Sequence, residues 1–205
     1  VDLWAKAQGC TLLEPERTKR VSGALLAGQT VRYWSAWPVA GEAPAGVERA
    51  GTPEAADFAL TLTPEGGALH LVPSIGVLGV GCRRGTTAER LEEAFSAFCA
   101  SSGLSPAAVS AAASIDLKKE EPGLAQFCEA HGWPITFYSA DQLRAVPGQF
   151  TPSAFVAGVT GVDNVCERAA AKASGGALLL PKTAGGGVTL ALAVRPFAPD
   201  WRTEQ

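Results

Sequence analysis

The sequence contains no methionine and only two histidines, His70 and His131, which lie far apart and have no spacing typical of metal ligands. Its five cysteines form no C-x-x-C pair, and an odd number does not complete a disulfide framework. We therefore predict no metal site, and reduced thiols in a cytoplasmic protein. No apolar run approaches the roughly 20 residues that a transmembrane helix needs, so we expect no membrane contact.

An excess of charge of either sign is also absent. Seventeen Lys and Arg residues face 20 Asp and Glu residues, which leaves a net charge of -3. A chain without a basic surplus has no global field that attracts a polyanion, so we do not expect nucleic acid as a partner. The chain begins at Val1 and has no basic and then apolar leader. We expect neither a signal peptide nor a natural start, and interpret the chain as a fragment.

What is present is enough apolar material for a folded core. The 205 residues are 47% hydrophobic and 18% charged, with 23 Gly and 14 Pro. Because a domain usually has roughly 150 residues, a chain of this length forms one large domain or two small ones. The hydrophobic fraction excludes wholesale disorder despite the many glycines and prolines.

Residues 1–72 are predicted to form a smaller α/β segment, with a domain boundary near Pro73. Its helix is predicted from the helical spacing of apolar residues, and its strands from the alternation of apolar and polar residues between turn residues. The expected elements are a helix over 14–27, strands over 31–37 and 58–63, and a surface loop over 39–53.

Beyond the boundary, strands and helices alternate. The expected strands cover 75–80, 112–115, 135–138, 178–181 and 188–194. The expected helices start at the capping box Thr86-x-x-Glu89 and at Ser105-Pro106, and cover 122–130, 139–146 and 165–173. Interleaved strands and helices are typical of a sheet covered on both faces. We therefore predict that residues 73–205 form a three-layer α/β/α domain with a mixed sheet.

The first candidate site is a glycine-rich turn between a strand and a helix. Its candidate binding residues are Gly79, Gly81, Cys82, Arg83, Arg84, Gly85 and Thr86. Glycines let the backbone approach a ligand, and the free N–H groups of a helix start beside two arginines suit an oxyanion. The third glycine falls one place late for G-x-G-x-x-G, so a nucleotide loop is weakly supported. A plain tight turn with solvent-facing arginines explains the motif equally well.

The second candidate site follows the predicted strand 112–115. It contains Ser114, Asp116, Lys118 and Glu121. Ligands of open α/β sheets lie beyond the carboxyl ends of strands, where such side chains can hold and titrate a polar substrate. Asp116 and Lys118 alternate, so both can point the same way from a strand end. The alternative is a charged, solvated loop.

The third candidate site combines two loops of small residues with a helix start. Its candidate binding residues are Thr151, Ser153, Gly161, Asp163 and Asn164. Helix capping explains Asp163 or Asn164 without any ligand. Cys166 lies on the apolar face of the helix and is interpreted as core. Cys82 is better exposed, but no histidine neighbours it, so we do not expect a Cys–His mechanism.

Together these segments resemble the C-terminal domain of the CbiG family, the cobalt-precorrin-5A hydrolases of anaerobic cobalamin biosynthesis. The resemblance covers residues 71–194, with motif order and spacing intact. It rests on Gly79-Val-Gly-Cys-Arg-Arg-Gly-Thr86, Ser114-Ile-Asp-Leu-Lys118 with Glu121, Phe150-Thr-Pro-Ser153, and Gly161-Val-Asp-Asn-Val-Cys-Glu-Arg-Ala-Ala170. CobE proteins of the aerobic pathway are similar to this domain alone. Residues 1–70 resemble the segment that precedes it in the hydrolases.

The resemblance implies that water opens the δ-lactone of a cobalt-corrinoid intermediate and releases acetaldehyde, without any cofactor besides the cobalt in the substrate. From the residues we infer Asp116 or Glu121 as the base and Lys118 as the oxyanion stabiliser. The family's N-terminal domain has no counterpart before Val1, so we expect this chain alone to bind without turnover.

The alternatives left open are a non-catalytic corrinoid carrier of the CobE type and, more distantly, a generic nucleotide-binding α/β protein. The partners considered besides the corrinoid are a second copy of the chain and neighbouring enzymes of the pathway.

Overall fold

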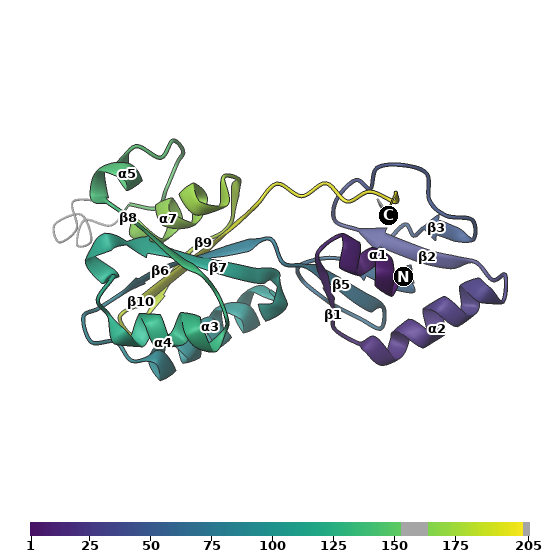
Figure 1. Cartoon of the computed structure of the whole chain (residues 1–205), viewed down its shortest axis with the longest axis horizontal. Helices are drawn as coiled ribbons and strands as arrows, with labels where there is room; N and C mark the ends of the chain where they lie inside the picture. The colour runs from purple at the N-terminus through teal and green to yellow at the C-terminus, as the bar shows by residue number, and fades with distance from the viewer. Residues whose placement is uncertain (153–163, 203–205) are drawn as a thin grey trace. The chain divides into compact units, whose positions relative to one another are not determined.

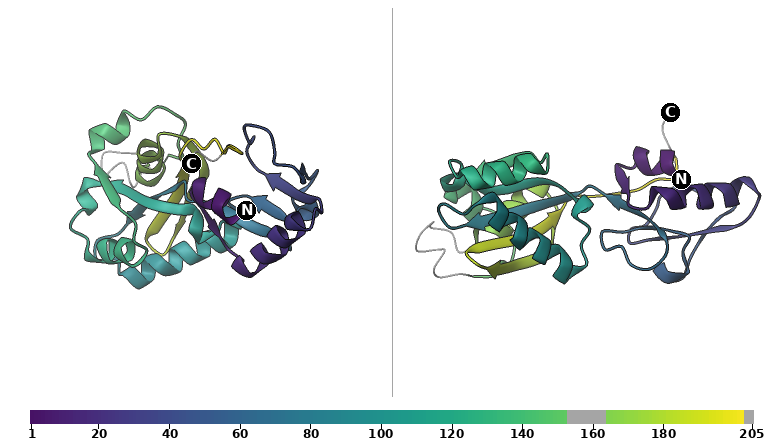
Figure 2. Two further views of the ribbon diagram at one scale, coloured as in Figure 1. Left: turned by 45° about the vertical axis from the view of Figure 1, so that its right-hand side comes forward. Right: turned by 90° about the horizontal axis from the view of Figure 1, so that it is seen from below.

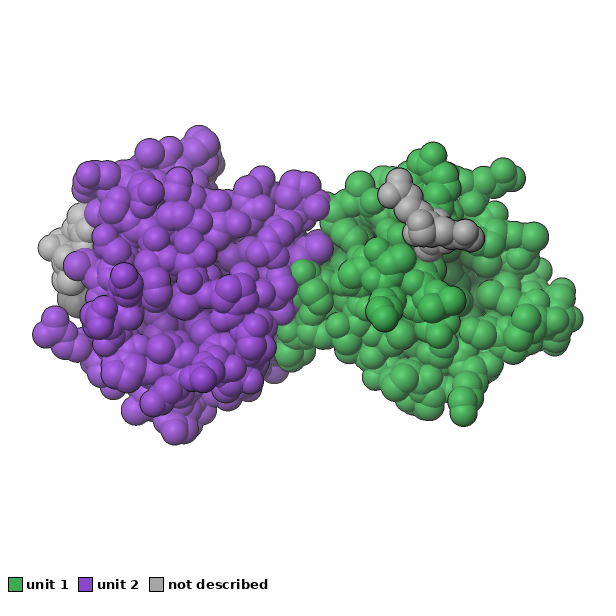
Figure 3. Space-filling model, viewed as in Figure 1, with its two compact units in different colours: residues 1–74, 103–108, 197–205 green, residues 75–102, 109–196 purple. Residues whose placement is uncertain are grey.

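The computed structural model describes residues 1–152 and 164–202. The chain divides into two compact units (Figure 3). Unit 1 comprises Val1–Ser74, Gly103–Ala108 and the segment from Phe197 onward, and unit 2 comprises Ile75–Ser102 and Val109–Pro196. The sequence analysis assigned residues 73–205 to one domain. The difference at the C-terminus arises because Phe197 and Trp201 pack into the core of unit 1.

Unit 2 is built on a mixed sheet with the strand order β8-β7-β6-β10-β9. Its strands are β6 (Gly76–Cys82), β7 (Val109–Ile115), β8 (Ile135–Tyr138), β9 (Ala177–Gly185) and β10 (Val188–Val194). Strands β6, β7 and β8 are parallel, and β10 is antiparallel to both β6 and β9. The carboxyl ends of β6 to β9 and the amino end of β10 therefore meet at one edge of the sheet.

Helices cover both faces of this sheet (Figure 1). On one face lie α3 (Ala88–Ser102) and α4 (Pro122–Ala130), and on the other α5 (Ala140–Arg144) and α7 (Val165–Ser174). The right-hand view of Figure 2 shows unit 2 from the side that α3 and α4 cover. The predicted three-layer α/β/α arrangement with a mixed sheet is confirmed.

Two glycines allow close packing in unit 2. A Cβ atom on Gly79 would lie 1.8 Å from the carbonyl oxygen of Cys166, so α7 packs directly on the backbone of β6. A Cβ atom on Gly123 would lie 2.1 Å from the carbonyl oxygen of Thr86. Glycine at both positions brings helix backbones against the segment that carries the first motif.

Unit 1 is a smaller α/β unit with the strand order β1-β5-β4-β2-β3. Its elements are α1 (Asp2–Ala7), β1 (Cys10–Leu12), α2 (Pro15–Leu26), β2 (Val31–Ser35), β3 (Val47–Arg49), β4 (Phe58–Leu60) and β5 (Leu69–Pro73). Only β1 is antiparallel to its neighbour β5, and the remaining pairs are parallel. The expected smaller α/β segment is therefore present.

Aromatic side chains fasten the C-terminal segment to unit 1. The Trp4 and Trp201 rings stack with centroids 4.5 Å apart, and Trp201 meets Tyr33 edge to face at 4.8 Å. Trp4 Nε1 donates a hydrogen bond of 2.7 Å to the carbonyl oxygen of Asp200. The first helix and the last described residues thus share one core.

Several predicted elements differ from the structure. The expected loop 39–53 contains β3, a three-residue edge strand that pairs only with β2 and carries little sequence signal. The sequence analysis predicted neither α1 nor β1. Strand β7 begins at Val109 rather than Ala112, because its alanines and serines lack strand preference. The N–H of Arg90 donates to Thr87 Oγ1 at 3.3 Å, so Thr87 takes the capping role expected of Thr86.

Within the described residues, short 3₁₀ turns also cover Pro53–Ala55, Pro106–Ala108 and Asp116–Lys118. The second replaces the short helix expected at Ser105. In the part of the chain that the structure describes, no helix is long and apolar enough to cross a membrane.

Candidate functional site

A cavity of about 1020 Å³ opens where the strand ends of unit 2 meet. It lies between the β6–α3 turn, the β7–α4 connection, the first turn of α7 and the β9–β10 hairpin. The candidate residues from the sequence that line it are Gly81, Cys82, Arg83, Arg84, Gly85, Lys118, Glu121 and Asn164. Side chains from all three motifs therefore face one space.

Other sequence candidates have different surroundings. Those outside the lining are Gly79, Thr86, Ser114, Asp116 and Thr151. Gly79 packs against α7, and the Ser114 hydroxyl is fully buried and donates to the Val80 carbonyl at 2.7 Å, which ties β7 to β6. Thr86 Oγ1 donates to the Arg83 carbonyl at 2.8 Å within the turn. Ser153, Gly161 and Asp163 lie outside the described residues.

The geometry expected for Asp116 and Lys118 was wrong. Strand β7 ends at Ile115, and Asp116–Lys118 form a 3₁₀ turn, so strand alternation does not apply. Lys118 lines the cavity, whereas Asp116 is exposed and outside it. Glu120, which the sequence analysis did not single out, also lines the cavity.

Glu121 links the first two motifs. Its carboxylate accepts a 2.8 Å hydrogen bond from the Gly85 N–H and a 3.1 Å hydrogen bond from Lys118 Nζ. The Gly85 bond most strongly lowers the pKa of Glu121, burial opposes it, and the Lys118 ammonium lowers it further. A carboxylate with a lowered pKa is a weak base, so this geometry favours a role in positioning Lys118 and the β6–α3 turn.

The arginines give the cavity mouth a positive charge. Arg83 and Arg84 are both exposed, and the N–H of Arg83 donates to the Gly187 carbonyl at 3.0 Å, which joins the turn to the hairpin. The rigid fork of a guanidinium suits a carboxylate. Exposed pairs contribute little each, so recognition has to come from several cations together.

A hydrogen-bonded group around the start of α7 contains two residues that the sequence analysis did not single out, Glu167 and Lys182. Asn164 caps α7, because its Oδ1 accepts from the Glu167 N–H at 2.9 Å, and its Nδ2 donates to the Thr151 carbonyl at 2.8 Å. Glu167 is fully buried and accepts from the backbone N–H groups of Thr151 and Lys182. Lys182 lines the cavity. The available sequence signal was a glutamate in the first turn of a predicted helix, and its burial is evident only in the structure.

The thiols near the cavity are poor nucleophiles. Burial is the main cause that raises the pKa of Cys82, and burial raises the pKa of Cys166 to about 11. All five cysteines are free. Among residues 1–152 and 164–202, no group of three His, Cys, Asp or Glu side chains could hold a metal ion.

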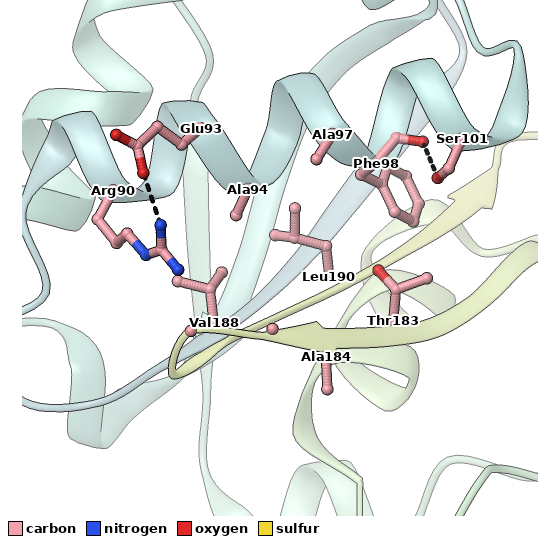
Figure 4. Close-up of a pocket in the computed structure, with 12 residues that line it drawn as sticks. Arg90, Glu93, Ala94, Ala97, Phe98, Ser101, Thr183, Ala184, Val188 and Leu190 are labelled. Carbon is pink, nitrogen blue, oxygen red and sulfur yellow. Dashed lines mark hydrogen bonds and ion pairs between the residues drawn. The ribbon is translucent and has the colours of Figure 1, made fainter.

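A second cavity, of about 370 Å³, lies between α3 and the β9–β10 hairpin (Figure 4). Arg90 and Glu93 form a 2.6 Å ion pair on its α3 wall, while Phe98 and Leu190 supply apolar surface. Its arginine is already paired within the helix, so this cavity is less suited to an anionic ligand than the larger one.

Comparison with known proteins gives the family. The family description "Cobalamin synthesis G C-terminus" matches residues 76–193, and "Cobalamin biosynthesis central region" matches residues 1–72. A cobalt-precorrin-5A hydrolase from Priestia megaterium is 36% identical over 134 residues, and one from Salmonella typhimurium is 37% identical over 124 residues. These matches cover 65% and 60% of this chain but only 35% of each hydrolase.

A shorter protein is also similar. Protein CobE from Sinorhizobium sp is 33% identical over 57% of this chain and 78% of its own length. A CobE crystal structure covers 62% of this chain and 94% of its own, with 34% identity and a TM-score of 0.55. A cobalamin biosynthesis protein G homolog from Sulfolobus solfataricus, at 16% identity and a TM-score of 0.51, covers 96% of this chain and 60% of its own, and shows the fold alone. The chain therefore belongs to the CbiG family and carries that family's central region and C-terminal domain.

Proposed function

We propose that the chain is the central and C-terminal part of a cobalt-precorrin-5A hydrolase, and that the large cavity of unit 2 binds the cobalt-corrinoid substrate. The supporting observation is that Arg83, Arg84, Lys118 and Lys182 all line this one cavity in a member of the CbiG family. The substrate carries acetate and propionate carboxylates. A wall with several cations suits such a polyanion.

The proposed reaction is hydrolysis of the δ-lactone by water, with loss of a two-carbon fragment as acetaldehyde. The cobalt belongs to the substrate, and we propose no further cofactor. Lys118, held by Glu121, is in a suitable position to stabilise the oxyanion that forms when water attacks the lactone carbonyl. Asp116 and Glu121 remain the proposed bases, although Asp116 lies outside the cavity lining and Glu121 is already hydrogen-bonded.

The test measures acetaldehyde release from cobalt-precorrin-5A. It uses this chain together with the remaining part of a hydrolase of the family, because the chain spans 35% of the hydrolases it matches. We expect Lys118→Ala and Asp116→Asn each to lower the rate roughly 10²- to 10⁴-fold, the usual worth of a positioned oxyanion or proton-transfer group. Corrinoid affinity should stay nearly unchanged in Asp116→Asn, and in Lys118→Ala it should fall only by the contribution of one cation among several.

The matched control is Lys119→Ala, which removes the same charge from an exposed neighbour outside the cavity lining. If the variants at positions 116 and 118 release acetaldehyde at the parent rate, the proposed roles are wrong. If the complete protein binds the corrinoid and releases no acetaldehyde, the hydrolase proposal itself fails.

The second candidate function is a corrinoid carrier of the CobE type. Two observations favour it: the match covers 78% of CobE but 35% of the hydrolases, and Asp116 lies outside the cavity lining. A carrier would bind the corrinoid with no turnover. The cytoplasmic localisation and a second copy or a neighbouring pathway enzyme as partner stay predictions.

A further inference from the structure

The geometry points to Lys182 as a substrate-binding residue of the large cavity, held in place by the buried carboxylate of Glu167. This inference rests on the proposed function, because it assumes that the cavity takes a corrinoid with free carboxylates. In it, Lys182 contacts a substrate carboxylate directly. Glu167 is a positioning residue that acts through Lys182.

An irregularity in β9 separates Lys182 from the regular strand pairing. Leu190 of β10 pairs with Thr183, and Leu192 pairs with Leu180, so Pro181 and Lys182 together oppose one residue of β10. Such a bulge leaves one residue outside the ladder and changes the direction of its side chain, often beside a binding site. The Lys182 N–H is thereby available to a partner outside the sheet.

That partner is Glu167, which has no solvent exposure. One carboxylate oxygen accepts from the Lys182 N–H at 2.6 Å and from Thr151 Oγ1 at 2.9 Å, and the other accepts from the Thr151 N–H at 2.8 Å. Burying a carboxylate is costly unless hydrogen bonds compensate for lost water. Here the compensating donors come from Thr151 and from Lys182, which lines the cavity, so Glu167 holds these two segments together.

The Lys182 ammonium retains capacity to bind a ligand. Within the described residues its one hydrogen bond is a 3.5 Å contact from Nζ to the Thr151 carbonyl. An ammonium has three donors, so donors remain for an incoming carboxylate. Lys182 lines the cavity and is partly buried, whereas Arg83 and Arg84 are exposed, so a carboxylate bound by Lys182 is less screened by solvent than one bound by either arginine.

The position of Lys182 sets what it can recognise. Lys118 follows β7 and Lys182 lies in β9, three strand spacings apart in the order β7-β6-β10-β9. At about 4.8 Å per strand, the axes of β7 and β9 are roughly 14 Å apart. The two lysines therefore line the cavity from elements that are not neighbours, which suits the proposed corrinoid, whose carboxylates lie around a macrocycle.

The experiment compares two probes by binding titration. One is cobyrinic acid, a cobalt corrinoid with free acetate and propionate groups, and the other is its methyl ester, which lacks these negative charges. We expect Lys182→Ala to weaken binding of the acid by roughly 5- to 30-fold and to leave binding of the ester unchanged. Lys182→Arg should recover most of the affinity, and the control Lys119→Ala should match the parent.

The outcomes separate this inference from the function on which it rests. If the parent binds neither probe, the corrinoid-binding function is wrong. If the parent binds the acid and Lys182→Ala binds it equally well, Lys182 has no role. Equal losses for the acid and the ester would assign Lys182 a structural role and also overturn the inference.

Glu167 is tested by a double-mutant cycle with Lys182→Ala. If Glu167 acts through Lys182, Glu167→Gln weakens acid binding, and adding it to Lys182→Ala causes little further loss. Additive losses would show that Glu167 does not act through Lys182. Should Glu167→Gln fail to fold, Thr151→Val removes one of the three hydrogen bonds to Glu167 and enters the same cycle.

Discussion

We expect Gly79→Ala and Gly81→Ala, two substitutions in the first motif, to destabilise unit 2 by different amounts. Both positions were predicted to let a ligand approach the backbone. In the structure, a Cβ atom on Gly79 would lie 1.8 Å from the Cys166 carbonyl oxygen and 2.7 Å from its carbonyl carbon. A Cβ atom on Gly81 would lie 2.4 Å from Thr189 Oγ1, beside the cavity.

The expected magnitudes follow from what each methyl group meets. At Gly79 the obstacle is the backbone of α7, so the helix has to move away from β6. Overpacking of a core typically costs about 1–3 kcal/mol, and a backbone obstacle favours the upper end, about 3 kcal/mol. At Gly81 the obstacle is the end of a short side chain that can rotate. We expect a cost below about 1.5 kcal/mol there.

The assay is urea-induced unfolding, with hydrogen exchange of peptides from unit 2 to assign the loss to that unit. A loss of about 3 kcal/mol corresponds to a fall of roughly 10 °C in Tm for a unit of this size. Gly23→Ala is the matched control. Its Cβ atom meets nothing within 4 Å in the interior of α2, so it should stabilise by about 0.5–1 kcal/mol.

A rescue test distinguishes the two obstacles further. Thr189→Ala should restore Gly81→Ala, because it removes the hydroxyl that clashes. Cys166→Ala should not restore Gly79→Ala, because the backbone carbonyl remains. Gly79→Ala with parental stability and weakened corrinoid binding would refute the packing interpretation and return Gly79 to the binding site.

Two further predictions concern the charges of the cavity. Replacing both Arg83 and Arg84 with Ala should weaken binding of cobyrinic acid by only roughly 2- to 30-fold, because both arginines are exposed. If the titrations show unchanged affinity, the two arginines are solvated surface residues without a binding role. The pKa of Glu121 is lowered in the folded protein, so its carboxylate stabilises the fold at pH values above the pKa of about 4.3 that a glutamate has in the unfolded chain. This contribution is lost as the pH falls through the lower pKa of the folded state. In Glu121→Gln, the midpoint of urea unfolding should therefore depend less on pH in the acid range than it does in the parent. An unchanged pH dependence would contradict this prediction.

The layer order of unit 2 could be predicted because its signals are local. Apolar spacing marks α3 and α7, and the run 188–194 reads as a strand that the structure shows over the same residues. The prediction for the alanine-rich β7 was too short, because the strand conformation of these residues depends on burial between two neighbouring strands. Three-residue strands such as β3 depend on tertiary pairing and leave no periodicity to detect.

The cavity was predictable in its location but less so in its residues. The carboxyl ends of parallel strands meet at one edge of a sheet, so motifs that follow them are expected there together. This reasoning predicted that Arg84 and Lys118 share one site. Which side chain enters the cavity depends on the backbone beyond the strand end, and the 3₁₀ turn after Ile115 leaves Asp116 outside the lining. Lys182 could not be found from sequence, because its availability depends on a bulge and on a hydrogen bond to Glu167 from another element.

The fastening of Trp201 to Trp4 means that both units are discontinuous in sequence. The chain leaves unit 1 after Ser74, returns to it at Gly103–Ala108 and returns again at Phe197. The first and last residues of unit 2 lie side by side, because the Arg195 N–H donates to the Ile75 carbonyl at 2.9 Å. Expression boundaries should accordingly respect this discontinuity, since a fragment ending at Ser74 would lack the indole that completes its aromatic core.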